Sequence, residues 1–444
     1  MRLHIGIDDT DSTKGGCTTY IAALLVERFS RMQIRFIDYP NIIRLNPNIP
    51  YKTRGNAAVA LRVEIPTTQY ETVREISIHT LEGGSEIAEG GTDPAVVLMP
   101  GKPPPAVTRL SRRALTEIVP VRDAVRTLRS ACGSAVSYGS GLGLVGALAA
   151  VGDTLDGDHT YELIAYRCRQ NLGKPRRVDD HSVIKMDWLT TPSTFNNYDA
   201  KNKRVLIKPH GPDPVLVGLR GETPLAVRSA FRLLQLHEPV DRWVIFRTNH
   251  GTEAHFELVK PQPPLRANYP VVLHGTVHGS PIRISGGHVF IELLTSGRIV
   301  RCAAFEPTGR FKEVVAKLIS GDEVTVFGGV KRRMIEKRSS LTVNLEKLII
   351  ESLEDDIVPE NPSCPRCDKR MKSAGRGQGL RCPRCKYSSP KGSKQFVLKK
   401  RSILPGLYIP DKKAHRHLTK PYSRYGLQNR RWDGKPPTGT WHRP

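Results

Sequence analysis

The spacing of hydrophobic residues divides the first part of the chain into alternating strands and helices. An apolar run at residues 2–8 predicts a buried strand, and helical spacing of apolar side chains predicts a helix over residues 18–29. Further strands are predicted at 34–38, 57–64 and 95–99, and further helices at 68–80 and 107–131. The glycine-rich stretch 139–146 then permits two interpretations, a phosphate-binding loop or close packing of backbone against a sheet.

Two further patterns follow this α/β unit. Residues 159–262 alternate strands and helices around a central hairpin, which is typical of a ferredoxin-like α+β domain. Residues 266–353 read as five short strands with one helix between the third and the fourth, the order of an OB-fold-like β-barrel. The sequence therefore predicts a multidomain α+β protein with domains 1–158, 159–262, 266–353 and 360–444.

Positive charge is concentrated at the C-terminus. The net charge is +25, and residues 361–444 hold 22 Lys and Arg against three Asp, so 19 of these charges lie in the last 84 residues. A block of this kind favours a polyanionic partner, and nucleic acid is favoured over a membrane because no amphipathic helix or lipidation motif adjoins it. The alternative is a disordered tail without specific contacts.

No apolar run reaches the roughly 18 residues of a membrane span. The N-terminal residues 1–7 lead directly into acidic residues, which argues against a secretory signal. We therefore expect a cytoplasmic protein.

Four of the eight cysteines form a metal-binding pattern. Cys364, Cys367, Cys382 and Cys385 make two Cys-Pro-Arg-Cys units. Four thiolates complete the tetrahedral shell of a structural Zn²⁺, which leaves no open position for a substrate. This pattern predicts a zinc ribbon. No role is predicted for the others, Cys17, Cys132, Cys168 and Cys302.

An acidic loop follows the first predicted strand. Asp8, Asp9 and Asp11 place three carboxylates within four positions, and carboxylate oxygens are good ligands for a Mg²⁺ ion shared with phosphates. Thr18 and Thr19 fall at the start of the next helix, where backbone N–H groups favour phosphate. A capped turn is the alternative, but three neighbouring carboxylates repel one another, so the functional interpretation is favoured.

Other polar segments are weaker candidates. Lys52 and Arg54 could supply charge to the phosphates of a nucleotide, although a solvated basic loop would look the same. Asp213 and Glu222 lie in polar, turn-forming segments of the second unit. Such loops often carry function.

Several segments together resemble one family, the archaeal 2-agmatinylcytidine synthetases of the CAU-anticodon isoleucine tRNA. The matching segments are residues 6–11, 17–19, 53–56, 161–167, 194–197, 209–214, 220–222 and 246–249. The barrel and the ribbon follow in the expected order, so the resemblance covers essentially the whole chain. It departs at His250, where we expect glutamine.

The resemblance implies a ligase with an N-terminal kinase-like, ATP-binding domain. Such an enzyme phosphorylates the C2 oxygen of the wobble cytidine, and the amine of agmatine then displaces phosphate, so that the tRNA reads AUA. It assigns Asp8, Asp9 and Asp11 to Mg²⁺ and ATP and Thr18 to autophosphorylation. Agmatine carries a guanidinium group, so its site should offer carboxylates, for which Asp213 and Glu222 are chosen on chemical grounds.

Two other functions compete with this one. A non-catalytic RNA-binding factor built on the barrel and the ribbon would explain the charge but leave the acidic loop without a role. A metal-dependent nuclease would use the same carboxylates and need no ATP. Consumption of ATP that depends on RNA separates the ligase from both.

Overall fold

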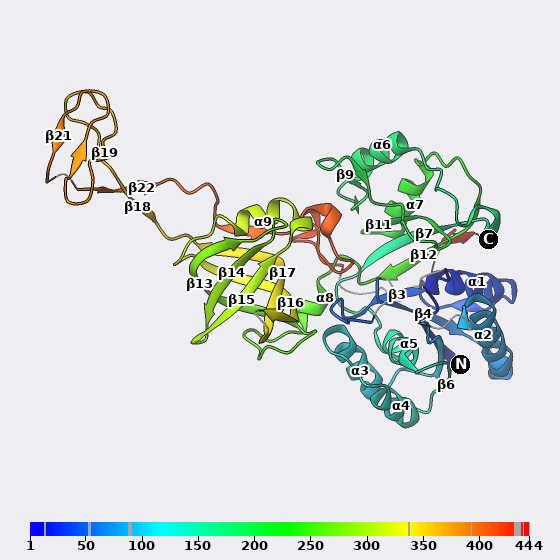
Figure 1. Cartoon of the computed structure of the whole chain (residues 1–444). Helices are drawn as coiled ribbons and strands as arrows, with labels where there is room; N and C mark the ends of the chain where they lie inside the picture. Colours follow the sequence, from blue (N-terminus) through cyan, green and yellow to red (C-terminus); the bar gives the residue numbers. More distant parts are fainter. Residues whose placement is uncertain are drawn as a thin grey trace.

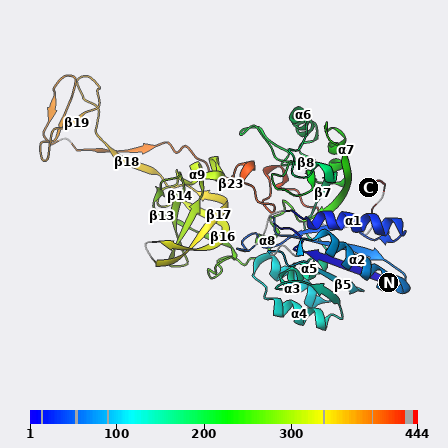
Figure 2. The same ribbon diagram turned by 45° about the vertical axis from the view of Figure 1, so that its right-hand side comes forward.

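The computed structural model describes residues 1–12, 15–51, 55–87, 91–335, 338–391, 393–429, 437 and 439–443. A two-part body lies beside a β-barrel, and a small lobe is held away from both on a narrow stalk (Figure 1). The same arrangement is visible after a 45° turn (Figure 2). In the described part of the chain, we find no helix with the length and hydrophobicity that a membrane span requires.

One mixed sheet runs through the body. Its order is β6-β5-β1-β4-β3-β12-β7-β11-β8, with β2 added to β4 and β24 added to β12. The strands are β1 (Arg2–Asp8), β2 (Arg35–Phe36), β3 (Asn41–Arg44), β4 (Ala57–Glu64), β5 (Ala95–Pro100), β6 (Ser134–Ser137), β7 (Thr160–Arg167), β8 (Thr194–Phe195), β11 (Val215–Gly221), β12 (Val240–Thr248) and β24 (His442–Arg443). The N-terminal unit (β1 to α5) and the middle unit (β7 to α8) join where β3 pairs with β12 in parallel.

Helices cover both faces of the N-terminal part of this sheet. On one face lie α1 (Thr18–Arg31) and α2 (Tyr70–Gly84), and on the other lie α3 (Pro105–Thr116), α4 (Val121–Ser130) and α5 (Leu142–Gly152). Strand β5 is apolar because both of its faces are covered. Val96 and Leu98 pack into the core on the side of α1 and α2, and Val97 and Met99 pack into the core on the side of α3, α4 and α5.

The prediction of one helix over residues 107–131 is wrong, because two helices, α3 and α4, occupy that range. Pro120 is the N-cap of α4 and has no N–H to donate to a continuing helix. The apolar spacing continues across this break because both helices cover the same core.

The middle unit has the predicted α+β character. It adds α6 (Asp180–Thr190), α7 (Pro224–Arg232), the short α8 (Ala254–Glu257) and a small hairpin of β9 (Tyr198–Asp199) and β10 (Arg204–Val205). Short 3₁₀ turns occur at Thr67–Gln69, Arg169–Asn171, Glu306–Thr308, Lys412–Ala414 and Tyr422–Arg424.

The predicted OB order is confirmed. The barrel strands are β13 (Pro270–Arg283), β14 (Val289–Thr295), β15 (Arg298–Ala304), β16 (Glu323–Ile335) and β17 (Arg338–Ser352), with α9 (Arg310–Val315) between β15 and β16. Parallel pairing of β15 with β17 closes the barrel, and β23 (Gly406–Tyr408) extends β17.

The zinc-ribbon lobe stands on a stalk of β18 (Asp356–Glu360) paired with β22 (Gln395–Lys399). Inside the lobe, β19 (Lys372–Ser373), β20 (Leu380–Arg381) and β21 (Ser388–Ser389) form a small sheet. Chain order and pairing agree with the sequence-based expectation of a separate ribbon.

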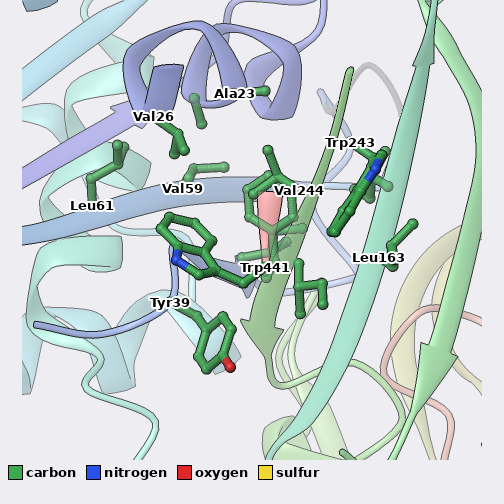
Figure 3. Close-up of a cluster of buried hydrophobic side chains, with 14 of the residues drawn as sticks. Ala23, Val26, Tyr39, Val59, Leu61, Leu163, Trp243, Val244 and Trp441 are labelled. Atoms are coloured by element: carbon green, nitrogen blue, oxygen red, sulfur yellow. The ribbon is translucent and has the colours of Figure 1, made fainter. Parts of the chain in front are cut away.

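The chain then returns from the stalk to the body. We call residues 401–443 the C-terminal strap. Its last strand, β24, pairs with β12, and Trp441 packs edge-on against Phe36 and Tyr39 with ring centroids 5.2 and 5.9 Å away. Figure 3 shows Trp441 among the side chains of the body core, beside Tyr39. The strap therefore forms part of the fold of the body.

Candidate active site

A cavity of about 400 Å³ lies between the N-terminal unit and the middle unit. The strap contributes one side chain to its wall, His417. Six of the predicted site residues line it, namely Asp8, Asp9, Asp11, Thr18, Thr19 and Asp213. The fold thus brings together predicted site residues that are up to 205 positions apart, from Asp8 to Asp213.

The acidic loop forms one side of the cavity. Burial raises the pKa of Asp8 well above its ordinary value, and the charge of Asp9 adds to the effect. Burial also raises the pKa of Asp9 to about 6, with Asp11 and Asp93 adding to it, although the backbone N–H of Asp93 donates to the Asp9 carboxylate at 3.1 Å. Partly buried carboxylates that repel one another gain most from a bound cation, so this oxygen-only set fits Mg²⁺.

Thr18 lies at the first position of α1, against the acidic loop. Its hydroxyl accepts a hydrogen bond from Thr10 at 3.0 Å and donates to Oδ1 of Asp11 at 3.2 Å. Gly16 has a φ of 74°, and a Cβ there would stand 2.4 Å from the carbonyl oxygen of Thr10. The sequence Gly16-Cys17-Thr18 therefore turns tightly enough to place a hydroxyl and the N-terminus of a helix beside the carboxylates.

The glycine-rich stretch leads into α5, which packs directly on the acidic loop. A Cβ at Gly146 would stand 1.7 Å from Oδ2 of Asp8, and one at Gly143 would stand 2.2 Å from the carbonyl oxygen of Asp93. Ser140 donates through its backbone N–H to Asp93 at 3.1 Å. Close packing of α5 against the acidic loop therefore explains why positions 143 and 146 are glycine.

The cavity wall also carries a basic cluster that the sequence analysis did not identify. Glu162 pairs with Arg44 at 3.2 Å and with Arg220 at 2.9 Å. Burial acts to raise the pKa of Glu162, but Arg220, His250 and Arg44 hold it well below its ordinary value. Arg44 and burial hold the pKa of His417 well below its ordinary value. Two guanidinium groups thus face one carboxylate.

Signals for this cluster in the sequence are faint. Glu162 is the one carboxylate of β7, and Arg44 is the last residue of β3. Burial lowers the pKa of His250 to about 4, and its ring packs edge-on against that of His417 at 5.1 Å. A contact between His250 and the strap has no local signature in the sequence.

The remaining predicted residues fall in different places. Lys52 and Arg54 lie outside the described residues. Asp213 is buried in the cavity wall and pairs with Arg176 at 3.3 Å. Glu222 does not line the cavity, because its carboxylate pairs with Arg424 of the strap at 2.7 Å.

The four ribbon cysteines converge on one point. All four sulfur atoms lie within 4.8 Å of one another, and the pairs Cys364–Cys385 and Cys367–Cys382 are 3.5 Å apart. This arrangement fits tetrahedral Zn²⁺ with bonds of about 2.3 Å.

Family models match the chain in the order of its structural units. The TiaS TCKD domain matches residues 4–133, the TiaS FLD domain 141–255, an OB-fold nucleic acid binding domain 271–351 and the TiaS C-terminal zinc ribbon domain 361–403. The predicted fold class is confirmed.

Curated relatives match over nearly their whole length. The isoleucine-tRNA 2-agmatinylcytidine synthetase TiaS of Archaeoglobus fulgidus is 39% identical over 433 residues, covering 97% of this chain and 99% of its own. That of Pyrococcus horikoshii is 40% identical over 421 residues, covering 95% and 97%.

Solved structures agree with these relatives. A complex of TiaS with its isoleucine tRNA and ATP matches with a TM-score of 0.84 at 37% identity, covering 98% of this chain and 99% of that one. A complex of TiaS with the same tRNA, AMPCPP and agmatine matches with a TM-score of 0.82 at 36% identity, covering 96% and 97%. The chain belongs to the family of 2-agmatinylcytidine synthetases of isoleucine tRNA, as the resemblance implied.

Proposed function

We propose that this protein is a ligase that attaches agmatine to C2 of the wobble cytidine, position 34, of the CAU-anticodon isoleucine tRNA and consumes ATP. One observation carries the proposal. A single cavity joins the acidic loop and Thr18 to the wall of the middle unit, in a chain that aligns with the family over 97% of its length. A cytoplasmic location follows from the tRNA substrate.

The reaction needs activation because a carbonyl oxygen is a poor leaving group. Transfer of a phosphoryl group from ATP to the C2 oxygen converts it into a good one. The neutral amine of agmatine then attacks C2, a C–N bond forms, the C2–O bond breaks, and phosphate leaves while the amine loses a proton. The transfer leaves ADP, so AMP forms as the nucleotide product when water also cleaves the bond between the α- and β-phosphates and releases a second phosphate.

The chain's own residues supply position and charge. We assign Asp8, Asp9 and Asp11 to holding Mg²⁺ together with the phosphates, whose charge the ion neutralises when bound. The Thr18 hydroxyl, 3.2 Å from Asp11, is placed to accept a phosphoryl group and pass its proton to that carboxylate. Thr19 on α1, with Lys52 and Arg54, completes the proposed phosphate site.

For agmatine we narrow the proposal to Asp213. Asp213 lies in the cavity wall, beside its partner Arg176, whereas Glu222 does not line the cavity. The ribbon zinc is structural in this proposal. Segment 1–158 carries the kinase-like chemistry, segment 159–262 completes the cavity, and segment 266–353 and the ribbon part of segment 360–444 hold the tRNA, while the strap belongs to the body.

Mass spectrometry of the wobble cytidine tests the proposal. Purified protein is incubated with the tRNA, agmatine, Mg²⁺ and ATP, beside a tube without ATP. We expect an agmatine adduct only with ATP, none from Asp9→Ala, and wild-type yield from the control Asp156→Asn, an exposed carboxylate outside the cavity lining.

The alternatives give different products. Bound but unmodified tRNA would favour the RNA-binding factor, and shortened tRNA in both tubes would favour the nuclease.

A further inference from the structure

Helix α4 carries a stripe of arginines on its outer side. Arg122, Arg126 and Arg129 are exposed and fall within about 60° of one another around a helix of 3.6 residues per turn. At a rise of 1.5 Å per residue, they are spaced about 6 and 4.5 Å apart along the axis. Ala124 and Leu128, on the other side, pack into the core under α3 and α5. Figure 1 shows α4 at the lower edge of the body.

In the part of the chain that the structure describes, no carboxylate pairs with this stripe. Asp123 is the one carboxylate of α4, and it pairs at 3.2 Å with Arg113 of the neighbouring α3. Within the described residues, none of the three stripe arginines forms an ion pair. Three like charges side by side on a helix repel one another by a few tenths of a kcal/mol per pair, which is a cost without benefit unless an anion binds there.

The stripe begins next to the proposed active site. Glu117 and Val119, in the turn that joins α3 to α4, line the catalytic cavity. A Cβ at Gly141 would contact Val121 at 3.3 Å, and Leu142 after it also lines the cavity. The stripe therefore extends from the wall of the cavity outward along the body.

We propose that Arg122, Arg126 and Arg129 bind the sugar–phosphate backbone of the anticodon arm of the tRNA. This inference rests on the proposed function, because a wobble base that enters the cavity brings the phosphates of its neighbouring nucleotides to the cavity rim. A row of arginines at helical spacing matches a row of phosphates in charge, and such contacts give affinity without reading sequence.

Binding measured at several salt concentrations tests the stripe. The probes are the CAU-anticodon isoleucine tRNA, a hairpin of its anticodon arm and a minihelix of its acceptor arm. The variant replaces all three stripe arginines with glutamine. The control replaces Arg31, Arg35 and Arg74, which lie on α1, β2 and α2 and make only surface ion pairs.

We expect the stripe variant to bind tRNA and the anticodon hairpin at least about tenfold more weakly near 0.1 M salt, with the slope of log K against log salt reduced by about two to three. Its affinity for the acceptor minihelix and the behaviour of the control variant should stay as in the wild type. Unchanged hairpin affinity and slope would overturn the inference, even if the wild type makes the adduct. Equal losses on hairpin and minihelix would also overturn it.

These measurements need no turnover, so they are separable from the proposed reaction. A wild type that binds the hairpin through the stripe but forms no adduct would refute the ligase and leave the stripe supported. A stripe that instead bound an acidic protein would show no change with any of the three RNA probes.

Discussion

The ribbon region and the strap are both strongly basic, but their charged side chains have opposite roles in the structure. Residues 361–400 hold 12 Lys and Arg against one Asp, and residues 401–444 hold 10 against two. In the strap, the Arg424 side chain is fully buried and pairs with Asp158 at 2.9 Å, and Lys420 pairs with the same carboxylate at 3.1 Å. By contrast, Arg370 of the lobe and Lys399 of its stalk pair with Glu360 of the stalk while remaining largely exposed.

This difference shows that charge density does not by itself identify a nucleic-acid surface. The interpretation of the whole basic block as RNA-contacting does not hold for Lys420 and Arg424. Their charges offset buried carboxylates of the body, and through the same strap His417 reaches the cavity. A deletion of residues 361–444 would therefore remove a part of the body together with the lobe.

The largest expected effect is from Arg424→Met. It leaves Asp158 and Glu222 buried with fewer partners, and breaking a buried pair on one side costs about 3–5 kcal/mol. Urea unfolding measures this loss in the free energy of unfolding. The matched change Arg370→Met in the lobe removes an exposed pair and should cost less than about 1 kcal/mol. Equal effects of the two variants would contradict the comparison.

Acid should destabilise the strap before the lobe. Burial lowers the pKa of His415 to about 4, and Arg44 and burial hold that of His417 well below 6.5, whereas residues 361–400 contain no histidine. Because the folded pKa values are depressed, this stability is complete above the unfolded value of about 6.5 and is lost as the pH falls toward 4, at about 1.4 kcal/mol per pH unit for each histidine.

Unfolding followed from pH 8 to pH 5 checks this prediction. In the variant His415→Gln, the free energy of unfolding should fall less steeply with decreasing pH, because the contribution of one histidine is removed. The exposed His181→Gln is the control and should leave the curve of the wild type unchanged. A decline that His415→Gln does not alter would assign the acid sensitivity to other groups.

Much of the fold was predictable from local patterns, and much of the cavity was not. Continuous apolar runs located the buried strands β1 and β4, and two Cys-Pro-Arg-Cys units located the ribbon. Asp8, Asp9, Asp11 and Thr18 were identified because their chemistry is concentrated in one short segment. Arg44, Glu162 and His417 meet only through long-range packing, so no window of sequence contains their signal.

Removal of zinc should unfold the lobe and leave the rest of the protein folded. The lobe core is small, with Met371 and Leu380 packed beside Cys364 and Cys382, so it depends on its metal. Cys382→Ser should release zinc and unfold the lobe. The melting temperature of the body should change by about 1 °C or less, because the two-stranded stalk is the connection between them in the described residues. The comparison is Cys302→Ala, which removes a buried thiol of the barrel. The protein with this substitution should retain its zinc.

The smallest expected effect concerns the salt dependence of tRNA binding. Arg376, Arg381 and Arg384 are exposed on the lobe and, in the described residues, form no ion pairs. Replacing all three with glutamine should reduce the slope of log K against log salt by up to about three, since each lost phosphate contact removes close to one unit. Folding should be unaffected.

The strap offers a control of the same charge. Lys413 is exposed near the middle unit, and Lys413→Gln should leave both the slope and the stability unchanged if the strap holds the body together and does not contact RNA. A reduction of one unit from Lys413→Gln would extend the RNA surface onto the strap. A lobe variant with the wild-type slope would instead mean that these exposed arginines contact no phosphate. The two basic regions would then differ only in how they fold.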